Sequence, residues 1–365
     1  MINGSKNKGD WSEFYALIYL LGAKRLFTAD ENLGKMDELF FPILKILKNE
    51  KQSDNSIRKI DFVINNNDII EVYVNSAFSE TRSVQEFVDE AVALKSDIIS
   101  ASGRQFIIPH GEFFLNSLHM NSLAASSQDV TDIRMELHDS LTGIDQEMGF
   151  SIKSYLGGAP TLFNASGATN FKYLVTGITP DQMQEINSID TRSKIVDRLT
   201  QIYEYGGNIH FQNAVNRIFS GNLMMLDSRM EELIGAMLLY SYKNGCTDCA
   251  ELISIMEDLN PLQYPRTGFY EYKFKKFLCA KALGMDPSKE WNGTDDANGG
   301  YIVVREDGEV LAYHLYNRDM FEQYLFDNTY LERASTTRHG YASLYVDQDN
   351  MYINLNLQIR FKDRN

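Results

Sequence analysis

Cysteine, proline and long apolar runs are all scarce in this sequence. Only three cysteines occur among 365 residues, an odd count that suits a reducing compartment better than a disulfide framework. Cys246 and Cys249 form a lone C-x-x-C with no second pair, so two thiols before a helix are a simpler interpretation than a metal knuckle or a redox pair. With seven prolines and 44% hydrophobic residues, the composition excludes a disordered tether.

The sequence also lacks any apolar run near the roughly 18 residues that a membrane-spanning helix needs. Its first ten residues are polar and do not resemble a secretory signal. We therefore expect a cytoplasmic protein with no membrane partner.

Basic residues are too few to balance the acidic ones, and the net charge is −15. This charge argues against a protein that coats nucleic acid non-specifically, because neutralising phosphates normally requires a basic surface. It does not exclude a cleft enzyme, which needs only a local positive lining and whose metal site concentrates carboxylates.

The length predicts two domains, since single cores rarely grow beyond roughly 250 to 300 residues. Residues 155–180 contain no acidic residue, and Lys172 is their only charge. We place the boundary near there and expect domains over 1–175 and 176–365. Periodicity and turn signals predict helices over 11–21, 34–48, 83–100, 180–205, 208–219, 229–244 and 272–283, and strands over 57–64, 69–74, 129–137, 149–154, 301–304, 310–316, 341–346 and 351–361.

Three residues on two predicted neighbouring strands have a spacing typical of nucleases. Asp132 begins one strand, while Ser151 and Lys153 lie two apart on the next and so share a face. Hydrolysis of a phosphodiester needs acidic ligands for a metal ion and a cation beside the developing charge. The spacing alone is weak, because a solvated aspartate beside a lysine produces the same pattern.

The wider sequence resembles the HpaII restriction endonucleases nearly from end to end. The resemblance rests on five stretches: N-K-G-D-W-S-E-F-Y at 7–15, G-F-S-I-K-S with T-L-F-N-A-S and T-N-F within 149–171, Y-E-Y-K-F-K-K-F-L at 270–278, T-T-R-H-G at 336–340 and L-N-L-Q-I-R-F at 355–361.

This resemblance implies an α/β fold of the PD-(D/E)xK nuclease type, in which helices flank a mixed sheet and a helical and β-hairpin C-terminal region recognises DNA. It implies Mg²⁺ as cofactor, with Asp132 and the main-chain carbonyl of Ile152 as metal ligands and Lys153 as the catalytic lysine. Ser151 departs from the family pattern, because most such nucleases carry Asp or Glu there. Some enzymes with Ser recruit a later glutamate, but no carboxylate lies between Lys153 and Asp181 here.

Glu13 is our candidate for the missing acid, since this fold commonly directs a glutamate from its first helix into the metal site. The alternative is that Glu13 closes a capping box with Asp10 as N-cap and Gly22 as the helix stop. Glu136 lies on the strand of Asp132 but too far along it, and we rank it with the loop residues Asp145 and Glu147 below Glu13.

For DNA contact, residues 264–289 are locally basic in an acidic protein and include several tyrosines. Phosphate tracking by this segment and a solvated helix side are equally open. The turn holding Arg338 and His339 is the better candidate for contacts to base edges, and His138 is interpreted as structural. The candidate phosphate contacts are Arg266, Lys273, Lys275 and Lys276.

These observations predict a type II restriction endonuclease that cuts double-stranded DNA at a short specific site, for which the resemblance suggests C-C-G-G. A homodimer on a palindromic site and a cognate DNA methyltransferase are the expected partners. A nicking or structure-selective repair nuclease on the same fold, and a catalytically dead nucleic-acid-binding module, remain as alternatives.

Overall fold

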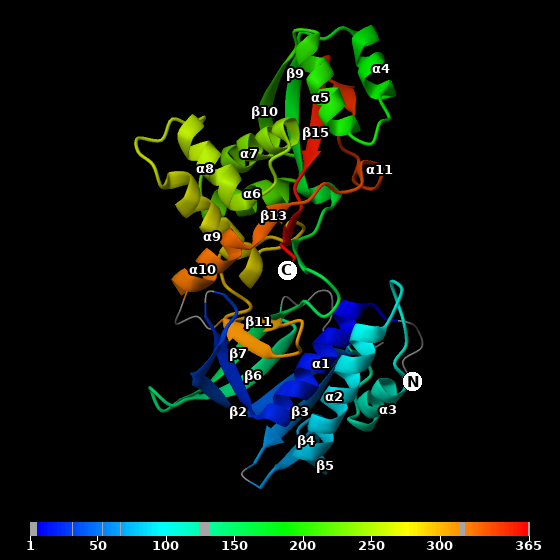
Figure 1. Cartoon of the computed structure of the whole chain (residues 1–365), viewed down its shortest axis with the longest axis vertical. Helices are drawn as coiled ribbons and strands as arrows, with labels where there is room; N and C mark the ends of the chain where they lie inside the picture. Colours follow the sequence, from blue (N-terminus) through cyan, green and yellow to red (C-terminus); the bar gives the residue numbers. More distant parts are fainter. Residues whose placement is uncertain are drawn as a thin grey trace. The chain divides into compact units, whose positions relative to one another are not determined.

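The structure is a computed structural model that describes residues 6–30, 32–52, 54–65, 67–123, 131–313 and 318–363. The chain divides into two compact units (Figure 1). The first comprises 1–160, 282–284 and 295–321, and the second comprises 161–281, 285–294 and 322–365. Within the described ranges, no helix is long and apolar enough to cross a membrane.

The first unit contains a nine-stranded sheet in the order β1-β12-β11-β7-β6-β2-β3-β4-β5. At its centre β6 runs antiparallel to β2 and β7, while β7 runs parallel to β11. The elements of this unit are α1 (Lys8–Ala23), β1 (Arg25–Ala29), β2 (Lys35–Lys51), β3 (Ile57–Ile64), β4 (Ile69–Val74), β5 (Ala77–Ser83), α2 (Val84–Ser100), α3 (Pro109–Ser117), β6 (Ile133–Asp139), β7 (Ile144–Ser154), β11 (Gly300–Val304) and β12 (Val310–Tyr313).

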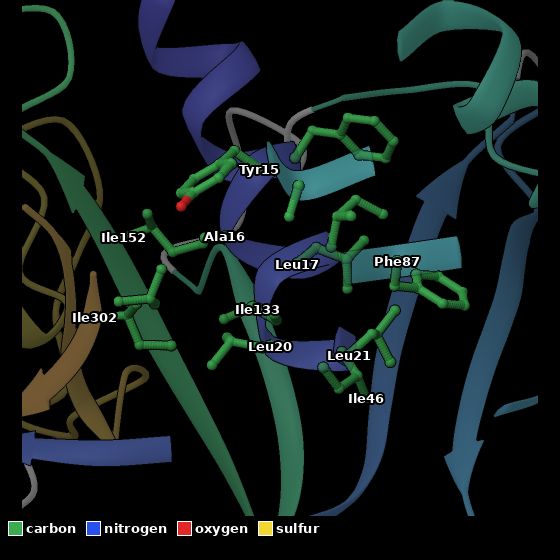
Figure 2. Close-up of a cluster of buried hydrophobic side chains, with 14 of the residues drawn as sticks. Tyr15, Ala16, Leu17, Leu20, Leu21, Ile46, Phe87, Ile133, Ile152 and Ile302 are labelled. Carbon is green, nitrogen blue, oxygen red and sulfur yellow. The ribbon is translucent and has the colours of Figure 1, made fainter. Parts of the chain in front are cut away.

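Helix α1 covers one face of this sheet. Ile133, Ile152 and Ile302 come from three adjacent strands and are buried in one cluster with the apolar residues of α1 (Figure 2). Side chains alternate across a strand, so residues one position away from these isoleucines lie on the opposite face. This alternation decides on which side of the sheet the polar residues of β6 and β7 lie.

Two predictions for α1 are corrected. The N-cap is Asn7, and Asp10 closes the capping box as the third helical residue, so Asp10 is not the cap and Glu13 is not part of the box. Gly22 does not stop the helix, which continues to Ala23. A Cβ at Gly22 would lie 3.1 Å from the backbone nitrogen of Val88, so the glycine allows α1 and α2 to approach closely.

The helix predicted over 34–48 is wrong, because the segment is the long strand β2. Its apolar residues recur at spacings that also fit a helix. Pro42, however, lacks the N–H that a helix interior requires and is accommodated in the strand, where it stands opposite Arg25 of β1. The strands predicted over 57–64 and 69–74 and the helix predicted over 83–100 are confirmed by β3, β4 and α2.

The second unit has a four-stranded sheet, β10-β9-β15-β14, and a three-stranded sheet, β13-β16-β8. Its elements, together with the two helices that reach the division between the units, are β8 (Thr161–Phe163), the short 3₁₀ helix Gly167–Thr169, β9 (Asn170–Thr176), α4 (Pro180–Ser188), α5 (Lys194–Glu204), β10 (Asn208–Ala214), α6 (Arg217–Leu226), α7 (Met230–Asn244), α8 (Cys249–Leu259), α9 (Phe269–Leu283), α10 (Arg318–Asp327), β13 (Thr329–Leu331), α11 (Thr336–His339), β14 (Leu344–Asp347), β15 (Asn350–Asn356) and β16 (Ile359–Phe361).

Three expectations for this part of the chain change. The helix predicted over 208–219 is wrong, because its first half is strand β10, which pairs with β9, and α6 starts only at Arg217. The single helix predicted over 180–205 is two helices, α4 and α5. The strand predicted over 351–361 divides between two sheets as β15 and β16.

The division between the units also differs from the predicted boundary at 175. The first unit ends at 160, and residues 295–321 return to it from the C-terminal half. Residues 295–321 belong to the first unit because β11 pairs with β7 and β12 pairs with β1. These strands are far apart in the sequence, so sequence order does not reveal their pairing.

Candidate active site

The pairing of β6 with β7 positions the predicted site. Ile133 is the partner of Phe150, and the main-chain N–H of Asp132 donates to the Phe150 carbonyl at 2.9 Å. This register places Asp132 beside Ser151. Because Ile133 and Ile152 point into the core, Asp132, Ser151 and Lys153 lie on the opposite face of the sheet, as the sequence predicted.

The carboxylate of Asp132 is held by two hydrogen bonds from β7. The Ser151 hydroxyl donates to Oδ2 at 3.0 Å, and the main-chain N–H of Ile152 donates to the same oxygen at 2.6 Å. Asp132 is half-buried and Ser151 is buried. The strand thus orients the carboxylate, and Ser151 contributes a neutral donor to it.

Lys153 is supported by an aromatic ring that sequence reasoning missed. Its Nζ lies 5.3 Å from the ring centroid of Tyr301, which is buried and stands opposite Ser151 in the parallel strand β11. Tyr301 in turn packs edge-on against Phe321, with centroids 5.2 Å apart. The quadrupole of an aromatic ring attracts a cation that lies over the ring. Tyr301 therefore holds the Lys153 ammonium group on this face of the sheet.

Glu13 is half-buried on α1 and takes no part in the capping box, which Asn7 and Asp10 form. Helix α1 covers the core face, opposite to Ser151. Its first turn nevertheless lies close to the end of β7, since a Cβ at Gly157 would come within 2.6 Å of the Lys8 side chain. Glu13 is therefore carried by a helix that begins near the end of the sheet where Lys153 lies, and its role at the site remains a prediction.

The competing carboxylates on β7 have partners farther along the hairpin. Asp145 lies 2.7 Å from the Nδ1 of His138, and Glu147 lies 3.6 Å from Arg134. His138 therefore faces a carboxylate on the exposed part of the hairpin. These contacts weaken both acids as replacements for the one missing at Ser151.

A second feature that sequence reasoning missed is the loop before β11. The side chain of Asn298 accepts a hydrogen bond from the Gly149 N–H at 2.8 Å, and the Gly299 N–H donates to the Gly149 carbonyl at 2.7 Å. A Cβ at Gly149 would meet Thr131 at 2.4 Å, so this position requires glycine. The loop supports β7 next to the site, and T-D-D-A-N-G-G at 294–300 is its sequence signal.

The donors at Asp132 have the chemistry that magnesium prefers. They are the Asp132 carboxylate and the predicted main-chain carbonyl of Ile152, both of them oxygen donors, and Mg²⁺ is commonly bound by one or two carboxylates with several waters and substrate phosphates. In the part of the chain that the structure describes, no group of three or more His, Cys, Asp or Glu side chains could hold a metal ion. The residues present fit a magnesium site with few carboxylates.

The basic residues predicted to contact DNA lie in the second unit and differ in their environments. Lys273 pairs with Asp227, Lys275 with Glu271 at 2.5 Å, and Lys276 with the buried Glu322 at 2.7 Å. These three lysines of α9 thus have acidic partners within the protein. Arg266 is exposed and lies over the ring of Phe269, with the guanidinium 5.6 Å from the ring centroid.

Arg338 and His339 belong to the short helix α11, which Ser335 caps and Gly340 ends in the left-handed conformation. Arg338 is exposed, and among the described residues it has no ion pair. Its guanidinium is therefore better placed to contact DNA than the lysines of α9.

The cysteines of the C-x-x-C are free thiols. Burial raises the pKa of Cys249 to about 12, and burial together with Glu251 raises the pKa of Cys246 to about 11. Metal binding and redox exchange both use the thiolate, so these values favour the interpretation as two structural thiols.

Comparison with known proteins places the chain among the restriction endonucleases. Residues 7–361 match the sequence profile of the HpaII restriction endonuclease. The chain is 40% identical over 363 residues to the type II restriction enzyme HpaII of Haemophilus parainfluenzae, and the alignment covers 98% of each protein. The chain therefore belongs to the HpaII restriction endonuclease family and is a site-specific deoxyribonuclease. No solved structure matches it.

Proposed function

We propose that this enzyme cuts both strands of duplex DNA at a short palindromic site with Mg²⁺, and that C-C-G-G is the first sequence to test. The observation that carries the proposal is the Asp132 carboxylate bonded to Ser151 on the face that also holds Lys153. Membership of the HpaII family supports the substrate class.

The sheet supports a PD-(D/E)xK core. Strands β2, β6, β7, β11 and β12 are consecutive neighbours, and only β6 and β12 run against the other three. The acid at the head of β6 and the lysine on β7 occupy adjacent strands in the middle of this sheet. Helix α1, with Glu13, lies across the core face.

In this site Asp132 and the Ile152 carbonyl would hold the metal ion, and Glu13 is proposed to complete its ligands. The chemistry that Mg²⁺ supplies is charge neutralisation at the scissile phosphate and activation of water. Lys153 places a positive charge beside the phosphate, where it stabilises the charge that develops in the transition state. Ser151 orients the Asp132 carboxylate through its hydroxyl.

We further propose that the second unit supplies DNA recognition and contacts between subunits. We also propose that the enzyme works as a homodimer, because the two active sites of a two-fold symmetric dimer can cut the two strands of a palindromic site. A DNA methyltransferase of the same specificity would protect the host. Mass photometry of the purified protein with and without duplex DNA tests the dimer.

The test of the activity is plasmid digestion with and without Mg²⁺, followed by sequencing of the fragment ends. Discrete fragments with one common end sequence are expected. A product that is only relaxed circle would instead indicate a nicking enzyme, and unchanged plasmid would indicate a dead binding module. Ends with no common sequence would contradict site-specific cleavage.

A further inference from the structure

Acidic residues are missing from the four stretches that contribute strands to the sheet β10-β9-β15-β14. The chain has 50 acidic residues among 365, yet none lies within 148–180, 205–226, 333–346 or 350–362. These stretches contain β9, β10, β15 and most of β14. The strands come from separate parts of the sequence, so the fold brings four acid-free segments together in one sheet.

One face of this sheet is covered by helices. Cross-strand partners share a face, and one row across the four strands is apolar. The Tyr173 hydroxyl donates to the Gly235 carbonyl of α7 at 2.8 Å, and Gly235 lies against the ring of Phe211. This covered row consists of Phe211, Tyr173, Ile353 and Leu344.

The opposite face, which we term the outer face, carries amides and aromatic rings. Lys172 lies over the Tyr352 ring, with its Nζ 3.7 Å from the centroid, and pairs with Asp347 at 2.8 Å. The charge of Asp347 is thereby neutralised. By their pairing, the outer face comprises His210, Leu174, Tyr352 and Tyr345 in one row and Asn213, Lys172 and Asn354 in the next. Gln212 is the extra residue of the bulge beside Asn213.

A β-bulge presents two amides at the edge of the outer face. The register of β10 against β9 shifts between Phe211 and Asn213. Gln212 and Asn213 are both exposed, and their amide nitrogens donate to carbonyls of their own strand, at 3.0 Å to Phe211 and 2.6 Å to Ala214. A bulge re-aims side chains, and bulges are frequent beside functional sites.

The turn that carries Arg338 is tied to the same face. The side-chain amide of Asn170, the first residue of β9, donates to the His339 carbonyl at 2.9 Å. The Tyr341 hydroxyl closes the turn by donating to the Ala334 carbonyl at 2.5 Å. Exposed Arg338 is thus held at the end of the outer face where β9 begins.

We propose that the outer face reads the bases of duplex DNA, with Gln212 and Asn213 contacting base edges at the bulge and Arg338 contacting them at the end where β9 begins. An antiparallel sheet often has one solvated face, but solvation alone does not explain why this face lacks acids in a protein of net charge −15. The phosphates of DNA repel carboxylates, so we expect a surface that docks on DNA to carry few of them. Amide and guanidinium groups are among the side chains that distinguish base pairs in the major groove.

This proposal rests on the proposed function, and its test separates the two. Gln212→Ala and Arg338→Ala would be compared with Gln184→Ala, an exposed glutamine on α4. Fluorescence anisotropy in calcium would measure the binding of two short duplexes, one containing the sequence that the wild type cuts and one with that sequence scrambled. Circular dichroism melting would show that each variant is folded.

We expect Gln212→Ala and Arg338→Ala each to bind the cut-site duplex about ten-fold more weakly, the loss of one good base contact, and to bind the scrambled duplex within two-fold of wild type. Gln184→Ala should match the wild type on both. If the first two variants also match the wild type while the wild type cuts DNA, the outer face does not read bases and the proposed function stands. If the wild type makes no specific cut, both proposals fail.

Discussion

The two units each contain a sheet with one face against helices and one polar face, and the two polar faces differ in the charge they carry. On β6 and β7 the polar face carries Asp132, Ser151 and Lys153, with further acids along the hairpin. On β10-β9-β15-β14 it carries amides and tyrosines, and Asp347 is paired with Lys172. Under the proposed function the first face would bind a cation that meets one phosphate, and the second would contact the bases of DNA.

Neutralising Asp132 on the first sheet should have the largest effect and tests the difference between the two faces most strongly. Asp132→Asn should lower the single-turnover cleavage rate by on the order of a thousand-fold or more, because it removes the charged ligand while keeping the shape of the side chain. Glu136→Gln is the matched control, since it removes a charge four residues along on the same face, and it should stay within three-fold of wild type. Near wild-type cleavage by Asp132→Asn would refute the site.

Lys153 and its ring partner give the next largest effect. Lys153→Met should cost roughly a hundred-fold in cleavage rate, because it removes the positive charge beside the phosphate. Tyr301→Leu should cost about three- to five-fold, the value of one exposed cation–π contact, while Tyr301→Phe keeps the ring and should restore the rate. Equal losses in the leucine and phenylalanine variants would show that Tyr301 acts through its hydroxyl instead.

The proposed role of Glu13 as a metal ligand can be tested separately from helix capping, because Glu13 is not part of the capping box. Glu13→Gln should cost several kcal/mol of transition-state stabilisation, on the order of a hundred-fold in rate, if this residue replaces the acid missing at Ser151. Asp10→Asn disturbs the capping box instead, and should lower stability by up to about 1 kcal/mol without changing the cleavage rate.

Ser151→Ala should be mild, at about 1 kcal/mol, because a neutral hydroxyl only orients Asp132. Single-turnover rates and thermal melts of the three variants would separate these roles. Normal cleavage by Glu13→Gln would rule out its place among the ligands, and the search would turn to Asp145 and Glu147.

The smallest effect on activity is expected on α9, where the lysines already have acidic partners. Lys276→Met removes the ion pair between Lys276 and the buried Glu322, so it should lower the free energy of unfolding by about 1–2 kcal/mol. Its affinity for DNA and the salt dependence of that affinity should match the wild type. A flatter salt dependence would instead show that Lys276 contacts a phosphate.

Local patterns predicted β6 and β7 of the first sheet, although the neighbouring strand β2 was predicted as a helix. Alternation over β6 and β7 was enough to put Asp132, Ser151 and Lys153 on one face, since side-chain direction in a strand depends only on neighbouring residues. Tyr301 was missed because it reaches Lys153 through β11, about 150 residues later in the chain. The outer face was missed for the same reason, with the added error that β10 was predicted as a helix.

Calcium titration calorimetry tests the central claim most directly, because it reads the proposed cation site without requiring turnover. Wild type, Lys153→Met and the control Glu136→Gln should bind calcium with similar affinity, whereas Asp132→Asn should lose the binding. If Asp132→Asn bound calcium as the wild type does, the polar face of β6 and β7 would not be the place where the metal acts.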